Sequence, residues 1–479
     1  MYVTIVKKGQ VNWYMHSNQF RIYTSRQKPV ELKAERVALH LGSQIIEAAT
    51  KHNEIYYLFF YKNNFLTAAK AKKLKRHSFI ANAFVQGMVF NAPHPFIDEL
   101  LAHSHPRRVN QFDPFLKKLD KQYTPHEKAF ILTFFESFIS KKRLFDEIKS
   151  IFYSFRRNGQ NFLAYKIVRV LMDFTPEHSL VKELSNDWSY RKYAKLYNEA
   201  SEEILNHDLI FAEKVFYYQR HKQDDARDLV MLLNEQSRWM ELAALYGERF
   251  IADPSDDNYD SLKQQLDRHM DNEQIMVSLE YLYDQLPRYA PLNQDLLHTY
   301  IQQQRIDRVL AVYQKSVTTL VIEDTELLRG MLEQLDLTSR SFSSEELQTL
   351  FELTLALNTK TAEHLIHTYT KTLLNLYKPS EIKELLKPYI EYRAVHPVYQ
   401  KMNAFIRFKD DLDHMQQLGE LYYEFKQFDE AIDCFSWDTE LNPDDPRPLK
   451  WLSKIYQERG MTQESEAYRQ LLVNQQRKA

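Results

Sequence analysis

The chain has 479 residues, of which 13% are aromatic and only 8 are glycine, and its formal net charge is −2. This length exceeds what one compact core supports, and so few glycines disfavour a glycine-rich phosphate loop. The single cysteine, Cys434, excludes an intramolecular disulfide framework and a metal site made of several cysteines. The composition therefore predicts a mostly helical, multidomain or repetitive protein of a reducing compartment.

Charge is distributed unevenly along the chain. Residues 1–110 carry 16 Lys and Arg against 6 Asp and Glu, a formal +10, so residues 111–479 carry −12. The longest apolar and aromatic run, residues 55–61, is far shorter than the roughly 20 residues that span a bilayer, and the N-terminus has no apolar signal-peptide segment. We therefore expect a soluble, cytoplasmic protein whose two parts differ in kind.

Residues 1–110 are expected to form a small basic α+β module. The first 25 residues alternate β-branched and aromatic side chains around two polar turns, which predicts two or three short antiparallel strands. The range 30–50 is predicted to be helical, since residues such as Leu32, Val37 and Leu41 share one helical face, although Gly42 weakens that prediction. The run 55–61 fits either a strand or a buried helix.

A proline-rich stretch follows, with five of the chain's 16 prolines between positions 93 and 125. Proline interrupts helices and central strands, so we expect an irregular connection and place the domain boundary at residues 111–123. At its end, Thr124 and Glu127 form the pattern of a capping box, with Pro125 at the first helical position. A helix over 128–139 is predicted to begin a helical array over residues 124–411.

The last 68 residues, 412–479, repeat with a period of 34. Leu418 falls on Leu452, and Tyr422 falls on Tyr456. Weaker copies of the same pattern occur upstream, at 145–178, 238–254 and 305–315, whereas 323–411 is expected to hold helical hairpins of irregular length. A helix–turn–helix unit of 34 residues is the signature of the tetratricopeptide repeat (TPR) family, which the chain resembles closely over 412–479 and loosely over 140–479.

The resemblance implies a mostly α fold, a TPR-like α-α superhelix that forms a right-handed solenoid, carrying the small N-terminal α+β module. In the best repeat, Gly419 is explained by a close helix crossing, which leaves no room for a larger side chain. Cys434 is expected to be a small buried residue of the second helix. Asp438 departs from the family pattern, where a small apolar residue is usual, and this puts tight packing at that crossing in doubt.

In TPR proteins, side chains of the first helices line the concave groove. The resemblance places these positions at Gln416, Glu420, Tyr423, Lys450, Lys454 and Gln457. They do not reproduce the Lys and Asn pattern of the carboxylate-clamp members, so binding of chaperone C-termini is not supported. The alternative is that these six residues are ordinary solvated helix positions.

A second candidate site is a basic run in the N-terminal module, which could hold an anionic partner such as a nucleic acid. It consists of Lys70, Lys72, Lys73, Lys75 and Arg76. The alternatives are a solvated helix face or a docking surface for the chain's own acidic array. No RNA-recognition aromatic motif, helix-turn-helix pattern or zinc knuckle accompanies the run.

Metal, cofactor and catalytic sites are not predicted. His94, His103 and His105 lie near Asp98 and Glu99, but their spacing matches no metal site, and a polar connecting loop is favoured. No Gly-x-Ser-x-Gly, P-loop or Gly-x-Gly-x-x-Gly motif occurs, so the sequence gives no support for an enzyme.

We therefore predict a bacterial, cytoplasmic TPR-like scaffold that binds a protein or peptide segment in its groove. One alternative is a peptide-sensing bacterial signalling regulator of the helical-repeat class, although no helix-turn-helix pattern or assignable catalytic Gln supports it. Another is nucleic-acid binding through the basic module.

Overall fold

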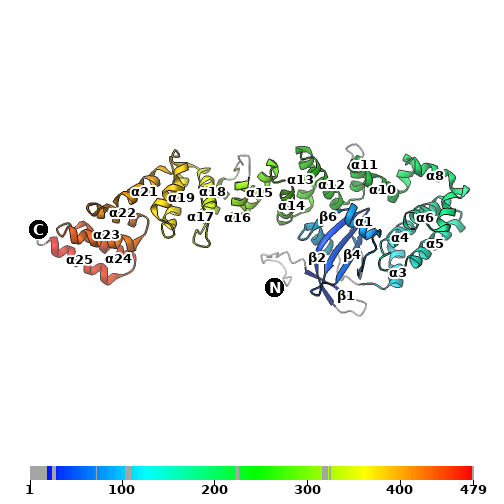
Figure 1. Cartoon of the computed structure of the whole chain (residues 1–479), viewed down its shortest axis with the longest axis horizontal. Helices are drawn as coiled ribbons and strands as arrows, with labels where there is room; N and C mark the ends of the chain where they lie inside the picture. The colour runs from blue at the N-terminus through cyan, green and yellow to red at the C-terminus, as the bar shows by residue number, and fades with distance from the viewer. Residues whose placement is uncertain are drawn as a thin grey trace. The chain divides into compact units, whose positions relative to one another are not determined.

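The computed structural model describes residues 19–23, 29–71, 73–102, 109–221, 226–315, 322 and 325–476. Two compact units divide the chain, Met1–Leu286 and Pro287–Ala479. The predicted fold class is confirmed, because the described residues are mostly paired helices, with a sheet near the N-terminus (Figure 1). None of the helices in the described part combines the length and apolar composition that crossing a membrane requires.

The sheet of the first unit is antiparallel throughout. Its strands are β1 (Gln19–Tyr23), β2 (Pro29–His40), β3 (Ser43–Ala49), β4 (Ile55–Tyr61), β5 (Asn64–Lys70) and β6 (Met88–Asn91). They are paired in the order β1-β2-β3-β4-β5, and β6 also pairs with β2. Two-residue turns join β2 to β3 and β4 to β5, with positive φ at Leu41, Gly42, Lys62 and Asn63. Positive φ at both central residues is what type I′ hairpin turns require.

The helix predicted over residues 30–50 is wrong, because this range forms the hairpin of β2 and β3. A bulge between Ala34 and Arg36 shifts the register of β2, and residues 37–40 beyond it are buried on both faces. Burial on both faces removes the alternation of apolar and polar residues that marks a half-exposed strand. The spacing of the apolar residues was therefore compatible with a helix. Gly42, which weakened the helical prediction, is the turn residue, and the run 55–61 is a strand.

The first strand predictions are tested only in part. Strand β1 agrees with the predicted strand pattern, while residues 1–18 lie outside the described residues. The proline-rich stretch contains two short helices, α2 (Pro95–Ala102) and α3 (Phe112–Gln122), where an irregular connection was expected. Prolines at helix starts are compatible with short helices, because the first turn needs no N–H from them.

The helical array begins at the predicted capping box. The Thr124 hydroxyl accepts a hydrogen bond from Glu127 N at 3.2 Å, and Glu127 Oε2 accepts one from Thr124 N at 3.1 Å. Helix α4 (Pro125–Thr133) starts there and ends six residues earlier than the predicted residue 139. It is followed by α5 (Lys141–Arg157) and α6 (Asn161–Phe174), whose connecting turn contains Gly159 with φ of 70°. These two helices confirm the predicted hairpin within 145–178.

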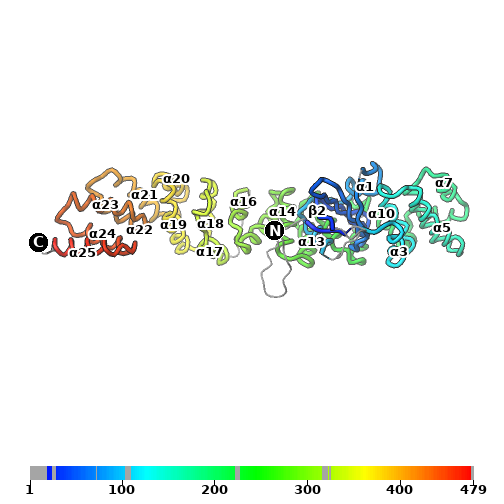
Figure 2. Tube along the Cα trace, turned by 90° about the horizontal axis from the view of Figure 1, so that it is seen from below, coloured from blue at the N-terminus to red at the C-terminus, as the bar shows by residue number. Residues whose placement is uncertain are grey.

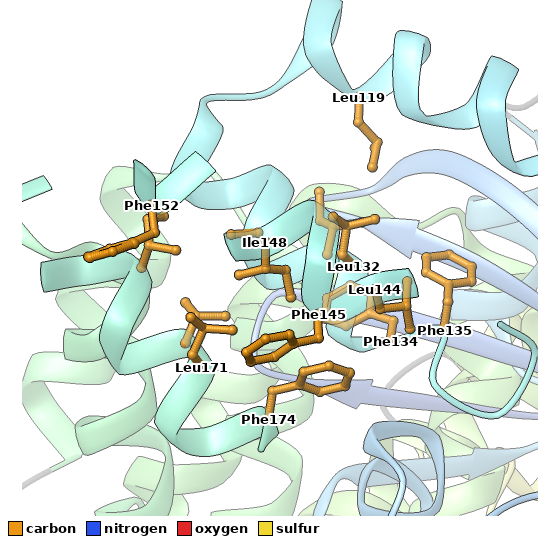
Figure 3. Close-up of a cluster of buried hydrophobic side chains, with 14 of the residues drawn as sticks. Leu119, Leu132, Phe134, Phe135, Leu144, Phe145, Ile148, Phe152, Leu171 and Phe174 are labelled. Carbon is orange, nitrogen blue, oxygen red and sulfur yellow. The ribbon is translucent and has the colours of Figure 1, made fainter. Parts of the chain in front are cut away.

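One buried hydrophobic cluster joins the sheet to these helices. Phe59 and Tyr61 of β4 belong to the same cluster as the apolar side chains of α3, α4, α5 and α6. Figure 3 shows its helical part, in which Phe145 of α5 and Phe174 of α6 lie close together. The division of the chain into domains stays a prediction, with the ranges 1–110, 111–123, 124–411 and 412–479. The sheet and the first helices share this hydrophobic core.

The remaining helices of the first unit are α1 (Phe79–Gln86), which lies between β5 and β6, and those that continue the array. The latter are α7 (Ser179–Asn186), α8 (Arg191–Asn198), α9 (Glu202–His207), α10 (Leu209–Gln219), α11 (Ala226–Glu235), α12 (Trp239–Ala252), α13 (Asp256–His269) and α14 (Asn272–Gln285). Helix α12 matches the second helix predicted within 238–254. The array also contacts the sheet through polar groups, since the Tyr217 hydroxyl donates to the Leu39 carbonyl at 3.1 Å.

The second unit is helical in its described residues. Its helices are α15 (Ala290–Gln302), α16 (Ile306–Lys315), α17 (Thr325–Glu333), α18 (Ser344–Leu355), α19 (Thr359–Leu373), α20 (Pro379–Leu386), α21 (His396–Phe408), α22 (Met415–Glu424), α23 (Phe428–Leu441), α24 (Arg447–Glu458) and α25 (Thr462–Gln476). Figure 2 shows α22 to α25 as two consecutive hairpins, which correspond to the two predicted 34-residue repeats. Helix α18 begins with a capping box, whose pattern of Ser343 followed three residues later by Glu346 is visible in the sequence.

The Gly419 crossing leads to a first prediction. A Cβ atom at Gly419 would lie 2.8 Å from the Phe435 ring, which itself stacks on Trp451, whereas a Cβ at Gly330 of α17 would meet nothing within 4 Å. Gly330→Ala should raise the unfolding free energy by roughly 0.5–1 kcal/mol through helix propensity. Gly419→Ala should lower it by about 1 kcal/mol, because overpacking of about 1–3 kcal/mol outweighs that gain. Urea unfolding of both variants checks this, and equal stabilisation by the two would disprove the close crossing.

Candidate protein-binding surface of the C-terminal repeats

The six predicted groove positions lie on the first helices of the two C-terminal hairpins. Because α22 and α24 are equivalent helices, residues 34 apart occupy corresponding places, as Glu420 and Lys454 do. Gln416, Glu420 and Tyr423 are half-buried on α22, whereas Lys450, Lys454 and Gln457 are exposed on α24. The structure therefore divides the six residues into a supporting set and an exposed set.

The supporting set on α22 is bonded to α24. Oε1 of Glu420 accepts hydrogen bonds from Gln416 Nε2 at 3.1 Å and from Trp451 Nε1 at 3.2 Å. The Tyr423 ring lies 4.8 Å from the Trp451 ring, and its hydroxyl donates to Glu458. These bonds hold the indole of Trp451 in place, so the predicted α22 residues position a side chain that was not itself predicted.

Trp451 is the central residue that sequence reasoning missed. It is half-buried, and its ring is nearly parallel to that of Phe435, with an interplanar angle of 6°. It was missed because the groove positions were taken from the family pattern, which Trp451 does not match. A signal was present, because the preceding repeat has the polar Gln417 at the equivalent position.

An open hollow of about 320 Å³ lies beside Trp451 on α24. Its walls are Arg447, Lys450, Trp451 and Lys454, which are spaced by one helical turn and therefore share one face. The Lys454 ammonium lies 4.7 Å from the centre of the Tyr423 ring and 4.8 Å from that of Trp451. Two of the six predicted residues, Lys450 and Lys454, thus line the hollow.

The hollow carries positive charge, of which only that of Arg447 has a carboxylate within 4.0 Å among the described residues. Arg447 binds Asp445 at 2.6 Å, and this hydrogen bond holds the pKa of Asp445 below its usual value. By contrast, no carboxylate of the described residues lies within 4.0 Å of the Lys450 or Lys454 ammonium. Two unpaired cations beside an indole ring can hold a carboxylate next to an apolar or aromatic side chain.

Two other residues singled out in these repeats are buried on α23. Cys434 is buried as predicted, and burial raises the pKa of its thiol to about 12. Asp438 is buried too, and its Oδ1 accepts a hydrogen bond from Asn442 Nδ2 at 2.8 Å. One carboxylate oxygen of Asp438 thus has a partner on the same helix, whereas Oδ2 is buried without a hydrogen-bond partner among the described residues. The close approach of Gly419 to Phe435 is nevertheless present.

The basic run of the N-terminal module is not a helix face. Lys70 ends β5 and pairs with Glu54 at 2.6 Å, and Lys73, Lys75 and Arg76 are exposed in the irregular segment before α1. The alternative of a solvated helix face is therefore wrong. Lys72 lies outside the described residues, and the role of this run in binding an anionic partner stays a prediction.

The first histidine of the cluster, His94, does not lie in the polar loop that the sequence predicts. His94 is buried at the start of α2, where its ring packs against Phe90 and Phe96 and its Nδ1 accepts a hydrogen bond from Phe96 N at 3.3 Å. Burial lowers the pKa of His94 to about 3. His103 and His105 lie outside the described residues, and within the described ranges no three His, Cys, Asp or Glu side chains are grouped to hold a metal ion.

Comparison with known protein families finds no match, and no curated protein matches the chain. Among solved structures, the chain is similar to one described as "Structure of Naa15/Naa10 bound to HypK-THB", with 12% sequence identity over 76% of this chain and 72% of that chain. The TM-score is 0.17. At this value the two chains do not superpose as wholes, and the likeness says nothing about what this chain binds.

Proposed function

We propose that this protein is a TPR-like scaffold that binds a segment of another protein on the inner face of its C-terminal repeats. The observation that carries the proposal is the hollow on α24, where Lys450 and Lys454 lie beside Trp451 with no carboxylate of the described residues within 4.0 Å. An extended or helical segment with acidic side chains and one large apolar side chain would complement this surface. The mechanism is equilibrium binding, with no covalent step and no cofactor.

The two kinds of side chain in the hollow have different expected contributions. Exposed ion pairs contribute about 0–1 kcal/mol each, so Lys450 and Lys454 would mainly select an acidic partner and speed its association. A half-buried Trp fixed by neighbours is the type of residue that dominates interface energies. Trp451, held by Glu420 and Phe435, is therefore proposed as the main anchor.

The alternatives have weaker support. One positive charge of the basic run is already paired, since Lys70 forms an ion pair with Glu54. Nothing in the described residues points to a secreted peptide as the partner or to a catalytic group, and we propose neither. The bacterial origin and the cytoplasmic location stay predictions.

Binding of a labelled acidic peptide to the full-length chain tests the proposed function. We expect a peptide of about twelve alternating Glu and Leu residues to bind at least tenfold more tightly than its Lys and Leu counterpart, because Lys450 and Lys454 attract carboxylates. Trp451→Ala should weaken binding by roughly 30-fold, the size of a hot-spot residue. The double variant Lys450→Glu, Lys454→Glu should weaken it and reduce its dependence on salt. Fluorescence anisotropy measures all three effects.

Trp437→Ala is the matched control, because Trp437 is 56% exposed on α23 of the same hairpin pair and does not line the hollow. It should leave the affinity unchanged. Equal binding of the two peptides, or an equal loss in the Trp437 and Trp451 variants, would refute the proposed surface.

A further inference from the structure

A second cavity, with a volume of about 280 Å³, lies within the first unit. It is partly open and lies where the β2–β3 turn and the start of α1 meet helices α4, α6 and α10. His40 and Leu41 contribute from the turn, and Phe79 contributes from α1. The cavity is therefore formed jointly by the sheet and the helical array and is separate from the hollow on α24.

Each helix contributes one face to this cavity. Helix α6 provides Lys166, Arg169 and Asp173, which are spaced by three or four residues, and α10 provides Phe211 and Lys214 at the same spacing. In a stacked helical array the inward face is normally apolar, because an unpaired charge is expensive to bury. The charged side chains on these faces of α6 and α10 therefore need hydrogen-bond partners or partners of opposite charge.

The carboxylates of the cavity are already satisfied by the protein. Asp208 accepts hydrogen bonds from the Tyr197 hydroxyl at 2.5 Å and from Phe211 N at 3.0 Å. Asp173 is paired with Lys214 at 2.6 Å, and Glu136 accepts a hydrogen bond from Phe79 N at 3.1 Å. A cationic ligand would have to displace these bonds.

Two cations of the cavity have no carboxylate within 4.0 Å among the described residues, although the charge of Asp208 acts on Lys166 from farther away. Lys166 is buried, and its ammonium donates to the His207 carbonyl, while no second acceptor is found for it among the described residues. Burial lowers the pKa of Lys166. The Arg169 guanidinium lies over the Tyr197 and Phe211 rings at 5.2 and 5.4 Å, and no carboxylate of the described residues comes within 4.0 Å of it. Both groups lie on the cavity face of α6 with N–H donors to spare.

We propose that this cavity binds one small organic anion, whose carboxylate or phosphate group is held between Lys166 and Arg169. The other walls include the aromatic rings of Phe130, Phe174 and Tyr218, so a planar apolar body fits beside the charged group. The volume lies at the small end of the usual range for ligand pockets, which favours a compound of one or two rings. This site does not depend on the function proposed for the C-terminal repeats.

Calorimetric titration of the full-length chain with three related probes tests the site. The probes are 2-naphthoate, 2-naphthyl phosphate and the neutral 2-naphthamide. We expect at least one of the anions to bind, with one molecule per chain, at least tenfold more tightly than the amide, because hydrogen bonds from Lys166 and Arg169 are stronger to a charged oxygen than to a neutral one. The better of the two anions identifies the preferred charged group. Failure of both anions to bind at millimolar concentration, or equal binding of the amide, would overturn the proposal.

Variants distinguish this site from other basic surfaces. Arg169→Gln should weaken anion binding by roughly 10–100-fold. Lys166→Met should weaken it similarly while leaving the melting temperature unchanged or higher, because an apolar chain replaces a buried cation. The exposed Arg191 on α8 does not line the cavity, so Arg191→Gln should have no effect. An equal loss in the Arg191 and Arg169 variants would refute the site, whereas Trp451→Ala, which impairs only the C-terminal hollow, should leave anion binding intact.

Discussion

Arg238→Met is expected to destabilise the first unit by about 3–5 kcal/mol, the largest effect of a single substitution that we anticipate. The side chain of Arg238 is only 3% exposed. Its two Nη atoms each lie 2.8 Å from a carboxylate oxygen of Glu213, and its Nη2 lies 3.1 Å from Glu241. Removing the guanidinium would leave two buried carboxylates without their counterion, which is the costly way to break a buried ion pair.

This cluster also connects the sheet to the array. Gln44 of β3 donates to Glu241 of α12 at 2.5 Å, and Arg238 itself precedes α12 and binds Glu213 of α10. Burial acts against the charged form of Arg238, but Glu213 and Glu241 together raise its pKa. The loss of the guanidinium should therefore loosen the contact between the β2–β3 hairpin and helices α10 and α12.

Urea unfolding, combined with hydrogen exchange of the β3 and β4 amides, measures this effect. Lys182→Met is the control in the same unit, because Lys182 and Glu177 form an exposed ion pair that should contribute little to stability. The triple variant Arg238→Met, Glu213→Gln, Glu241→Gln should recover part of the loss, since no charge remains buried. A loss below about 1 kcal/mol in the single variant would contradict the importance of the cluster.

Acidification from about pH 6.5 to about pH 4.5 should lower the unfolding free energy of the first unit by roughly 4–5 kcal/mol. His40 and His94 are buried, and burial lowers the pKa of each to about 3. The unfolded chain takes up protons at these residues near pH 6.5, whereas the folded chain does not until about pH 3. The unfolding free energy is therefore not reduced by these histidines above about pH 6.5. Between about pH 6.5 and about pH 3 it falls by about 1.4 kcal/mol per pH unit for each histidine.

The surroundings of both histidines explain why the folded state resists protonation. The His40 ring lies against Phe79, Tyr217 and Tyr218, and the charge of Arg220 adds to the effect of burial. None of these neighbours offers a carboxylate to stabilise an imidazolium. His94 is enclosed by the rings of Phe90, Phe96 and Tyr281 in the same way.

Comparison of unfolding at pH 7 and pH 5 checks this prediction. His40→Phe keeps an aromatic ring and His94→Asn keeps an acceptor for Phe96 N. Each should remove about half of the loss in stability that these two histidines cause together. The exposed His52 serves as control, and His52→Asn should leave the dependence unchanged. If both buried variants retained the full pH dependence, other groups would have to be responsible.

Local features of the fold were predictable from the sequence. The 34-residue period identified α22 to α25 because each repeat packs mainly on its neighbours, so the pattern of Leu418 and Tyr422 recurs one unit later. Gly419 was understood for the same reason, as a residue whose contact lies within its own hairpin. The capping boxes at Thr124 and Ser343 involve residues three positions apart, and both are present.

The binding surfaces were predictable only in part. Lys450 and Lys454 were named from the repeat pattern and line the α24 hollow, but Trp451 was not, since its role depends on bonds from Glu420 and on the Phe435 ring of another helix. The cavity of the first unit left no motif in the sequence. Lys166 and Arg169 are close in the chain, but His40 and Lys214 reach the same cavity from distant segments.

The sequence by itself determined the helical repeats, their period and their caps, because these depend on interactions between residues a few positions apart or in adjacent repeats. Only the tertiary structure decided that residues 29–49 form strands, because the burial of residues 37–48 on both faces comes from helices elsewhere in the chain. The tertiary structure also decided which charged side chains have a partner of opposite charge. Arg238 is neutralised by two carboxylates from the array, whereas Lys166 and Arg169 are left facing a cavity, and this difference arises only when the sheet and the helices pack together.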